Sequence, residues 1–296
     1  MNLEKVFTDF LQRENLVDKK LLLCVSGGVD SRVLLEVAAK AHPKKLLAVF
    51  HLDHNLRKES HKDFLFVQKI CSKNKIKFYG ETLQNLPVKN RESYWRKKRL
   101  QLAHKAARDF GAERILTAHH ATDLVETMIF RLTKGTGVSG LAPFEIEKKP
   151  FWSVSKSEII QYADTQKLEY QEDKSNTDEQ FERNLIRQKI LPHLRTITPN
   201  LEKVFVTESE IFRETAAFLS AELENHFHAR SIPLSAFLQL HPALQKEFLR
   251  RIAKKIPSSS DVEDCLLWLQ NNPKGNSTKL LGKTKLLIQE KTIFWD

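Results

Sequence analysis

The chain has 296 residues, of which 41% are hydrophobic, and this length allows one large domain and a smaller one with an ample core. Its formal net charge of +11 favours a polyanionic partner, although a basic surface that serves only solubility would give the same number. Cys24, Cys71 and Cys265 lie far apart without a CxxC pair, which argues against a disulfide framework or a thiolate metal site and favours a reducing cytoplasm.

The first half of the chain alternates short apolar runs with amphipathic segments. After an opening helix, strand-like runs occur at 20–25, 46–52, 76–83 and 114–120, and helix-like segments at 30–41, 60–74, 91–109 and 121–134. This alternation predicts an α/β fold with βαβ units and a buried parallel sheet. In such a sheet, ligands bind at the carboxyl ends of the strands. We expect neither a signal sequence nor a membrane anchor, because no apolar stretch reaches membrane-spanning length.

The character of the sequence changes beyond about Pro192. The pattern predicts a long helix over 201–227, shorter helices within 242–256 and 260–272, and hairpin strands within 277–296. We therefore expect a catalytic domain at 1–195, a helical linker at 196–230 and a small α+β domain at 231–296. The surplus of basic residues lies in the first part, since residues 1–200 have a net charge of +10 and residues 201–296 a net charge of +1.

The stretch "LLLCVSGGVDSRVLLEV" (21–37) predicts a strand, a tight turn and a helix. Gly27 and Gly28 permit the turn and let backbone N–H groups approach an anion at the positive end of the helix. A Walker loop would end in a lysine that reaches the terminal phosphates, and that lysine is absent here. A plain glycine turn would explain the same letters, but Ser-Gly-Gly-x-Asp-Ser resembles the pyrophosphate loop of the N-type ATP pyrophosphatases. The resemblance implies a pyrophosphate leaving group, with Asp30 placed to hold Mg²⁺.

Four further motifs follow the loop in a fixed order. They are "HLDHNLR" (51–57), "RESYWRKKRL" (91–100), "HHATDLVET" (119–127) and "EDKSNTDEQFERNLIR" (172–187). Together with the loop they resemble the tRNA(Ile)-lysidine synthetases over roughly residues 20–190. The resemblance implies a cytoplasmic ligase with ATP and Mg²⁺ as cofactors. It would adenylate the wobble cytidine of an isoleucine tRNA with a CAU anticodon and then replace AMP with L-lysine, changing codon recognition from AUG to AUA.

The resemblance also implies a set of site residues. These are His119, Asp123, Glu126, Arg96 and Arg99 for catalysis; Ser26, Gly27, Gly28, Val29, Asp30, Ser31 and His51 for ATP; Asp123 and Glu126 for lysine; Arg183 and Arg187 for the tRNA or the intermediate; and Asp30 for the metal. The C-terminal domain would contact the tRNA, and the sequence leaves a homodimer open. The chain departs from the usual family pattern at Thr122, Leu124 and Leu100.

The chemistry explains why these residue types suit the reaction. A lysine ε-amine has a pKa near 10.4 in water, so the site must bind the cation and then remove its proton, and carboxylates can do both. His119, Asp123 and Glu126 have the spacing i, i+4, i+7, which would place them on one helical face. A solvated acidic face would show the same spacing.

A basic helix precedes these carboxylates. Tyr94 and Trp95 interleave with the cations of the segment 91–108, a pattern that suits phosphate contact and base stacking. The glycine-rich segment 133–143 is interpreted as a mobile loop near the substrate or, alternatively, as a plain surface connection.

Three other functions compete with the lysidine interpretation. A tRNA thiolase shares the ATP loop, but such enzymes typically have CxxC pairs, which this chain lacks. A tRNA-binding protein with a decayed nucleotide fold would explain the charge but not the intact loop. A small-molecule amide-forming ligase would not depend on tRNA.

Overall fold

The computed structural model describes residues 2–53, 60–83, 91–143, 145–171, 182–226, 230–255, 257–271 and 276–296. The chain divides into two compact units, one formed by Met1–Leu124 with Phe144–Asn184 and the other by Val125–Pro143 with Leu185–Asp296. Among the described residues, no helix is long and apolar enough to cross a membrane.

Unit 1 contains the expected alternation of strands and helices. Its strands are β1 (Leu21–Cys24), β2 (Leu47–Asp53), β3 (Lys77–Thr82) and β4 (Arg114–Leu116). Its helices are α1 (Leu3–Arg13), α2 (Val29–Ala41), α3 (Ser60–Asn74), α4 (Arg91–Phe110), α7 (Lys156–Thr165) and α8 (Glu182–Leu185), with the start of α5 (Ala121–Lys134) and the short 3₁₀ turns η1 (Lys44–Leu46) and η2 (Ile146–Lys148). The predicted α/β class and the four predicted strands are confirmed.

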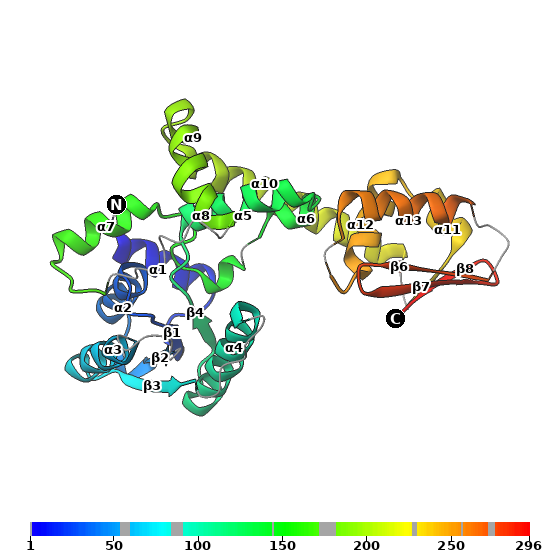
Figure 1. Ribbon diagram of the computed structural model, residues 1–296. Coiled ribbons are helices and arrows are strands. Elements are labelled where there is room, and N and C mark those ends of the chain that lie inside the picture. The colour runs from blue at the N-terminus through cyan, green and yellow to red at the C-terminus, as the bar shows by residue number, and fades with distance from the viewer. Residues whose placement is uncertain are drawn as a thin grey trace. The chain divides into compact units, whose positions relative to one another are not determined.

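The sheet is parallel throughout, in the order β3-β2-β1-β4. Alternate residues of each strand enter different cores: Leu21 and Leu23 pack in the core that includes α1, α2, α3 and α7, whereas Leu22 packs with α4. Figure 1 shows the sheet between these helices. Because both faces are covered, the strands are apolar along their length, which explains the continuous hydrophobic runs of the sequence.

The strand order determines where a ligand can bind. The connection from β1 runs to β2 on one side, while β4 pairs with β1 on the other side. The order of the sheet therefore reverses at β1, and the segments that follow β1 and β4 leave the same edge of the sheet next to each other. This edge is where the loop at 25–28 and the segment at 117–120 are found.

Unit 2 is mainly helical and ends in an antiparallel sheet. Its helices are the remainder of α5, α6 (Val138–Leu141), a π-helical turn (Ile186–Ile190), α9 (Leu191–Ile197), α10 (Leu201–His226), α11 (Leu234–Gln239), α12 (Pro242–Ile252) and α13 (Ser259–Asn271). Its strands are β5 (Ser231–Pro233), β6 (Ser277–Leu281), β7 (Thr284–Gln289) and β8 (Thr292–Trp295), in the order β5-β8-β7-β6. Phe237, Leu249 and Leu286 are fully buried in the core between this sheet and its helices.

The compact units divide the chain differently from the expected segments 1–195, 196–230 and 231–296. The last part of α5 and α6 belong to unit 2, and α10 packs against both α6 and α12. The segment 196–230, which we expect to be a helical linker, contains α10 and belongs to unit 2. Sequence periodicity could not reveal this, because an amphipathic helix shows that it has a partner but not which partner.

Candidate functional site

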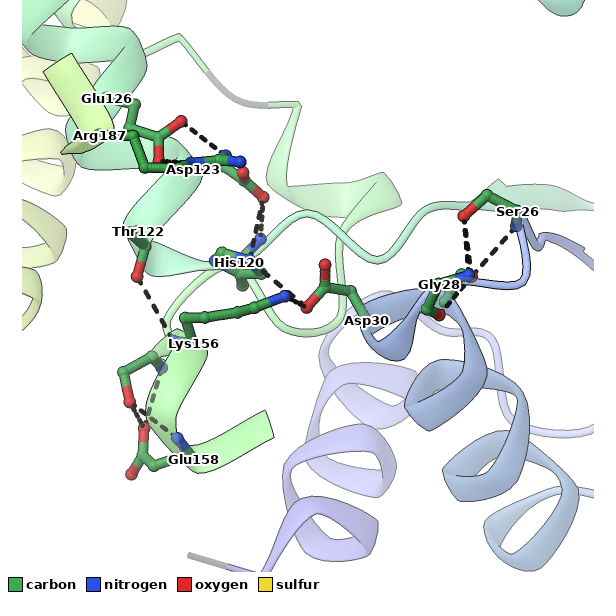
Figure 2. A network of polar contacts seen from close by, with 12 residues as sticks. Ser26, Gly28, Asp30, His120, Thr122, Asp123, Glu126, Lys156, Glu158 and Arg187 are labelled. Carbon is green, nitrogen blue, oxygen red and sulfur yellow. Dashed lines mark hydrogen bonds and ion pairs between the residues drawn. The ribbon is translucent and has the colours of Figure 1, made fainter. Parts of the chain in front are cut away.

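The loop between β1 and α2 is organised by one hydroxyl group. Ser31 Oγ accepts hydrogen bonds from the N–H groups of Ser26 and Gly27, at 3.1 and 3.2 Å, and donates to the carbonyl of Gly28 at 3.0 Å. Figure 2 shows this turn at the start of α2. Ser31 is buried, so it holds the loop from within rather than lying at its surface. Gln171 N–H donates to the carbonyl of Gly27, which attaches the loop to a distant segment.

Gly27 and Gly28 differ in backbone conformation and therefore in whether another residue could replace them. Gly27 has a φ of +98°, a backbone conformation that L side chains rarely adopt. Gly28 has an ordinary φ of −69° and acts as the N-cap of α2. A methyl group at Gly28 would meet only Ser26 Oγ, at 3.7 Å. The fold therefore demands glycine at position 27, whereas the glycine at position 28 leaves open space at the positive end of the helix.

The segment after β4 brings a second group of side chains to the same unit. Helix α5 begins at Ala121, so His119 and His120 precede it, and the helical spacing expected for His119 does not apply. Asp123 accepts a hydrogen bond from the N–H of His120 at 3.0 Å, which fixes its carboxylate at the start of α5. His120 Nε2 lies 3.6 Å from both Asp123 Oδ2 and Asp30 Oδ1, and Figure 2 shows the ring between the two carboxylates.

A lysine from a distant part of the sequence completes this cluster. Lys156 Nζ contacts Asp30 Oδ1 at 2.5 Å, and Figure 2 shows the two side chains pointing toward each other. Lys156 is the first residue of α7, whose start is fixed by a capping box between Ser155 and Glu158. A cation in the first turn opposes the helix dipole, so this position is favourable only with an anion nearby, and Asp30 supplies it.

Lys156 and His120 are the two residues of this cluster that sequence reasoning missed. The motif Ser155-x-x-Glu158 does signal a helix start in the sequence. Nothing local indicates that Lys156 reaches Asp30, 126 residues away. His120 is buried, and its Nδ1 has no hydrogen-bond partner among the described residues.

His119 lies in a different electrostatic setting from an isolated histidine. His119 is exposed to solvent, but desolvation by the atoms packed around its ring lowers its pKa to about 4. Asp123 opposes this effect, and the positive charges of Lys149 and Arg99 add to it. His119 Nδ1 is 2.9 Å from the hydroxyl of Thr117. The imidazole is therefore neutral near pH 7 and does not repel a cation that approaches Asp123.

His51 has a structural contact in the fold. It is 4% exposed, and its Nδ1–H donates to the carbonyl of Val25 at 2.8 Å, at the start of the loop. Burial lowers the pKa of His51, so the ring is neutral. This contact braces the loop, and the expected contact of His51 with ATP stays a prediction.

Glu126 and Arg187, both in unit 2, form a two-bond ion pair. Arg187 Nε and Nη2 donate to the two carboxylate oxygens of Glu126 at 2.6 and 2.8 Å. The side chain of Glu126 is 5% exposed and that of Arg187 is 40% exposed. Two parallel bonds to one carboxylate fix the plane of the Arg187 guanidinium group.

The remaining predicted site residues are arginines, and those whose side chains the structure describes are exposed. Arg99 is exposed on α4, and its charge influences both His119 and Cys24. Arg183 is exposed on α8, and the π-helical turn that begins at Ile186 interrupts the regular spacing to Arg187 on which the expected common face depended. The side chain of Arg96 lies outside the described residues, as do the segments 54–59 and 172–181 of two motifs.

The three departures from the family pattern lie in different surroundings. Thr122 is buried, and its hydroxyl accepts a weak hydrogen bond from the N–H of Lys156 at 3.4 Å. Leu124 is fully buried, as expected for an apolar residue facing the interior, and Leu100 is 51% exposed.

Burial raises the pKa of all three cysteines, of Cys24 to about 11 and of Cys71 and Cys265 to about 12, so they remain thiols near neutral pH.

Comparisons with known proteins agree with this geometry. The sequence profile of the PP-loop domain family matches residues 1–194. A tRNA(Ile)-lysidine synthase of Petrotoga mobilis is 34% identical over 80% of this chain and 85% of its own length. A bifunctional TilS/HprT protein of Listeria monocytogenes is 33% identical over 74% of this chain, and the match spans only 36% of that longer protein.

A solved structure shows a similar fold. The U34-tRNA thiolase NcsA from Methanococcus maripaludis, with its [4Fe-4S] cluster, aligns with a TM-score of 0.59 over 72% of this chain and 78% of its own. The two sequences are only 15% identical, so the likeness concerns the fold alone.

Alanine substitutions at Gly27 and Gly28 should separate folding from ligand binding. Gly27→Ala should lower the free energy of unfolding by about 1–3 kcal/mol, because a side chain is strained at this φ. Gly28→Ala should change it by less than about 0.5 kcal/mol but weaken the binding of ATP, because the methyl group would occupy the space in which we expect the N–H groups at the start of α2 to meet the phosphates. Urea denaturation and calorimetric titration with ATP measure the two effects. Equal destabilisation by both variants would contradict this distinction.

Proposed function

The chain belongs to the PP-loop family, in the group of the tRNA(Ile)-lysidine synthases, and on this premise we propose that it is an ATP-dependent ligase that forms lysidine. Its substrates would be ATP, L-lysine and the isoleucine tRNA with a CAU anticodon in the cytoplasmic tRNA pool. The single observation that best supports this proposal is the lysine-free pyrophosphate loop with Asp30, Asp123 and Lys156 gathered beside it.

The first half of the reaction is attachment of AMP to the wobble base. The C2 oxygen of cytosine attacks the α-phosphorus of ATP, a new P–O bond forms, and pyrophosphate leaves. The N–H groups in the first turn of α2, at Val29, Asp30 and Ser31, would hold the leaving pyrophosphate. This converts a poor leaving group at C2 into a good one.

Lys156 would supply the positive charge that a Walker lysine supplies in other phosphate loops. Its ammonium group already contacts Asp30 at the loop, and α7 delivers it from outside the motif. On binding ATP, Lys156 can turn from Asp30 toward a phosphate oxygen, because both are anionic oxygen acceptors.

The donor set at the loop fits Mg²⁺. This ion is commonly bound in proteins by one or two carboxylates together with substrate phosphates, rather than by a complete protein cage. Among the described residues no group of three or more ligating side chains forms such a cage, whereas Asp30 stands at the loop with an accessible carboxylate. When bound there, Mg²⁺ would neutralise charge on the phosphates.

The second half is attack of the lysine ε-amine on C2 of the activated base, which releases AMP. Asp123 would bind the ammonium group of lysine and assist the loss of its proton, next to the neutral ring of His119. Glu126 remains a proposed second carboxylate for lysine. Because Arg187 engages both of its oxygens, we assign the larger share of ammonium binding to Asp123 and a contact with the tRNA or the intermediate to Arg187.

The alternatives fit less well. The three cysteines are protonated, lie in separate places and include two that are buried, which does not suit the cysteine chemistry of a thiolase. A decayed nucleotide fold does not explain why Ser31 still organises the loop.

The direct test of the proposed function is the incorporation of labelled lysine into bulk tRNA. With ATP and Mg²⁺ we expect incorporation into the isoleucine tRNA with a CAU anticodon, together with equal amounts of AMP and pyrophosphate. Omission of tRNA is the control. Release of ADP and phosphate, or incorporation that does not depend on tRNA, would contradict the proposal.

Lys156→Met should impair the first half-reaction. Removal of a charged hydrogen bond to a phosphate should raise the KM for ATP by about tenfold or more. Lys45→Met is the matched control, because Lys45 is exposed in the same unit and lies in a 3₁₀ turn away from the loop. Steady-state kinetics measure the KM, and tRNA affinity should not change in either variant. A wild-type KM in Lys156→Met would refute its role.

Asp123→Asn should separate the two half-reactions. The amide oxygen can still accept the hydrogen bond from His120, so the start of α5 is kept, but the charge that binds lysine is removed. Lysine transfer should slow by about tenfold or more while adenylation persists.

The measurement for Asp123 is a two-stage assay. Each variant is incubated with tRNA and ATP labelled in the adenine ring, the adenylated tRNA is isolated, and lysine is then added. Glu126→Gln is tested in parallel, and its effect on transfer should be smaller than that of Asp123→Asn. If adenylation collapses in folded Asp123→Asn, this carboxylate acts with Asp30 in the first half-reaction instead.

A further inference from the structure

The ring of His120 lies between the two carboxylates that the proposed mechanism assigns to different half-reactions. Its Nε2 is 3.6 Å from Oδ1 of Asp30, which belongs to the phosphate loop. The same atom is 3.6 Å from Oδ2 of Asp123, which would bind the substrate lysine. Figure 2 shows the ring in this position. None of the steps described above uses this ring, although it lies where the two groups of side chains meet.

Neither of these two contacts is a hydrogen bond. A bond from N–H to oxygen is about 2.7–3.2 Å long, so both separations of 3.6 Å are too long. Both neighbours of Nε2 are oxygens of carboxylates, which accept hydrogen bonds when ionised, and we therefore place a proton on Nε2. One N–H group of His120 thus faces two acceptors at equal distance and is bonded to neither of them.

The surroundings of His120 hold its backbone but allow its ring to turn. The N–H of His120 donates to Asp123 Oδ2 at 3.0 Å, and its carbonyl accepts from the N–H of Leu124 at 3.1 Å. The ring is buried, and its Nδ1 has no hydrogen-bond partner among the described residues. The direction of the ring therefore depends on the two carboxylates that face Nε2.

A ligand can reach these carboxylates without touching the ring. The side chains of Asp30 and Asp123 are 33% and 23% exposed, whereas that of His120 is 4% exposed. Each carboxylate lies in the first turn of a helix, Asp30 in α2 and Asp123 in α5, where a negative charge is stabilised. His120 is therefore placed to act as a positioning residue, through the carboxylates, and not on a substrate directly.

Binding of ATP would change the partners of Asp30. Its Oδ1 is shared by Lys156 Nζ, at 2.5 Å, and by the ring of His120. Once Asp30 is engaged at the loop by ATP with its cation, this oxygen is no longer offered to the ring. Asp123 then remains as the acceptor that faces Nε2–H, and a donor that was shared between two acceptors has only one.

We propose that His120 couples the two half-reactions by positioning Asp123: when ATP engages Asp30, the Nε2–H group bonds to Asp123 and orients this carboxylate for the ammonium group of the substrate lysine. The inference rests on the proposed function, because it takes ATP and L-lysine as the two ligands. Coupling of this kind is reciprocal, so lysine strengthens the binding of ATP by the factor by which ATP strengthens the binding of lysine. Lysine is then held tightly only when the base can be activated.

Calorimetric titration of the full-length chain, without tRNA, measures this coupling. α,β-Methylene ATP with Mg²⁺ is titrated with and without saturating L-lysine, and lysine is titrated with and without the ATP analogue. The methylene bridge replaces the bond whose cleavage releases pyrophosphate, so no reaction occurs during the titration. We expect each ligand to bind at least roughly fivefold more tightly to the wild type in the presence of the other. Independent binding of the two ligands would overturn the proposal.

Two substitutions at His120 separate positioning from packing. The amide nitrogen of asparagine lies near the place of imidazole Nδ1 and that of glutamine near the place of Nε2, so only glutamine brings a donor to the two carboxylates. His120→Asn should reduce the coupling factor to about one, while each ligand alone binds within about twofold of the wild type. His120→Gln should retain most of the coupling. Full coupling in His120→Asn would overturn the proposal, as would its loss in a stably folded His120→Gln.

His42→Asn is the matched control for the loss of a buried histidine. His42 lies in the same unit, is also buried, and its ring contacts the carbonyl of Lys19 at 2.9 Å, away from the loop. Its variant should keep the coupling of the wild type. Loss of coupling in both asparagine variants would indicate a general loosening of the fold and would overturn the role of His120.

The result for the proposed function is read separately. Wild-type protein that incorporates lysine into tRNA but shows no coupling in the titrations would refute the role of His120 and leave the proposed function intact. Wild-type protein that incorporates no lysine into tRNA would refute the proposed function.

Discussion

The pairing of β1 between β2 and β4 is the constraint on which the candidate site depends. Parallel pairing on both sides forces the segments after β1 and β4 to leave the same edge of the sheet. One of these segments is the glycine loop and the other contains His119 and His120. Without this order, the carboxylates of Asp30 and Asp123 would have no reason to approach the same histidine ring.

At this edge of the sheet, the positive charge of Lys156 lies against the negative charge of Asp30. Lys156 stands at the positive end of α7, an unfavourable place for a cation, and Asp30 stands at the positive end of α2, a favourable place for an anion. Their contact couples two helices through one ion pair. An anionic ligand at the loop could take over the contact of Lys156 with Asp30 without any further cation being brought in. Such an exchange of partners suits a site that binds and releases a polyphosphate.

Unit 2 shows that a segment has neighbours which the sequence does not reveal. The glycines of 133–143 suggest a mobile loop or a plain surface connection, and in the structure a Cβ added at Gly137 would lie 2.7 Å from Arg250 Nε of α12. Similarly, α10 lies in the segment 196–230 that we expect to be a helical linker, and within unit 2 it contacts α6 and α12. In both cases a partner more than 20 residues away gives the segment its role.

The sequence by itself determined the strands, the helices around them and the phosphate loop. These depend on local physics: apolar runs for buried strands, the 3.6-residue period for helices, and glycines at a turn. It also indicated Asp30, Asp123 and Ser31 through motifs. Only the tertiary structure decided that Ser31 organises the loop from within, that Lys156 reaches Asp30, that His120 lies between two carboxylates and that Arg187 engages Glu126. The bonds of Ser31 span only four or five residues. The approach of Lys156 and His120 to Asp30, and of Arg187 to Glu126, is instead fixed by strand order and helix packing, and no local pattern in the chain encodes such long-range contacts.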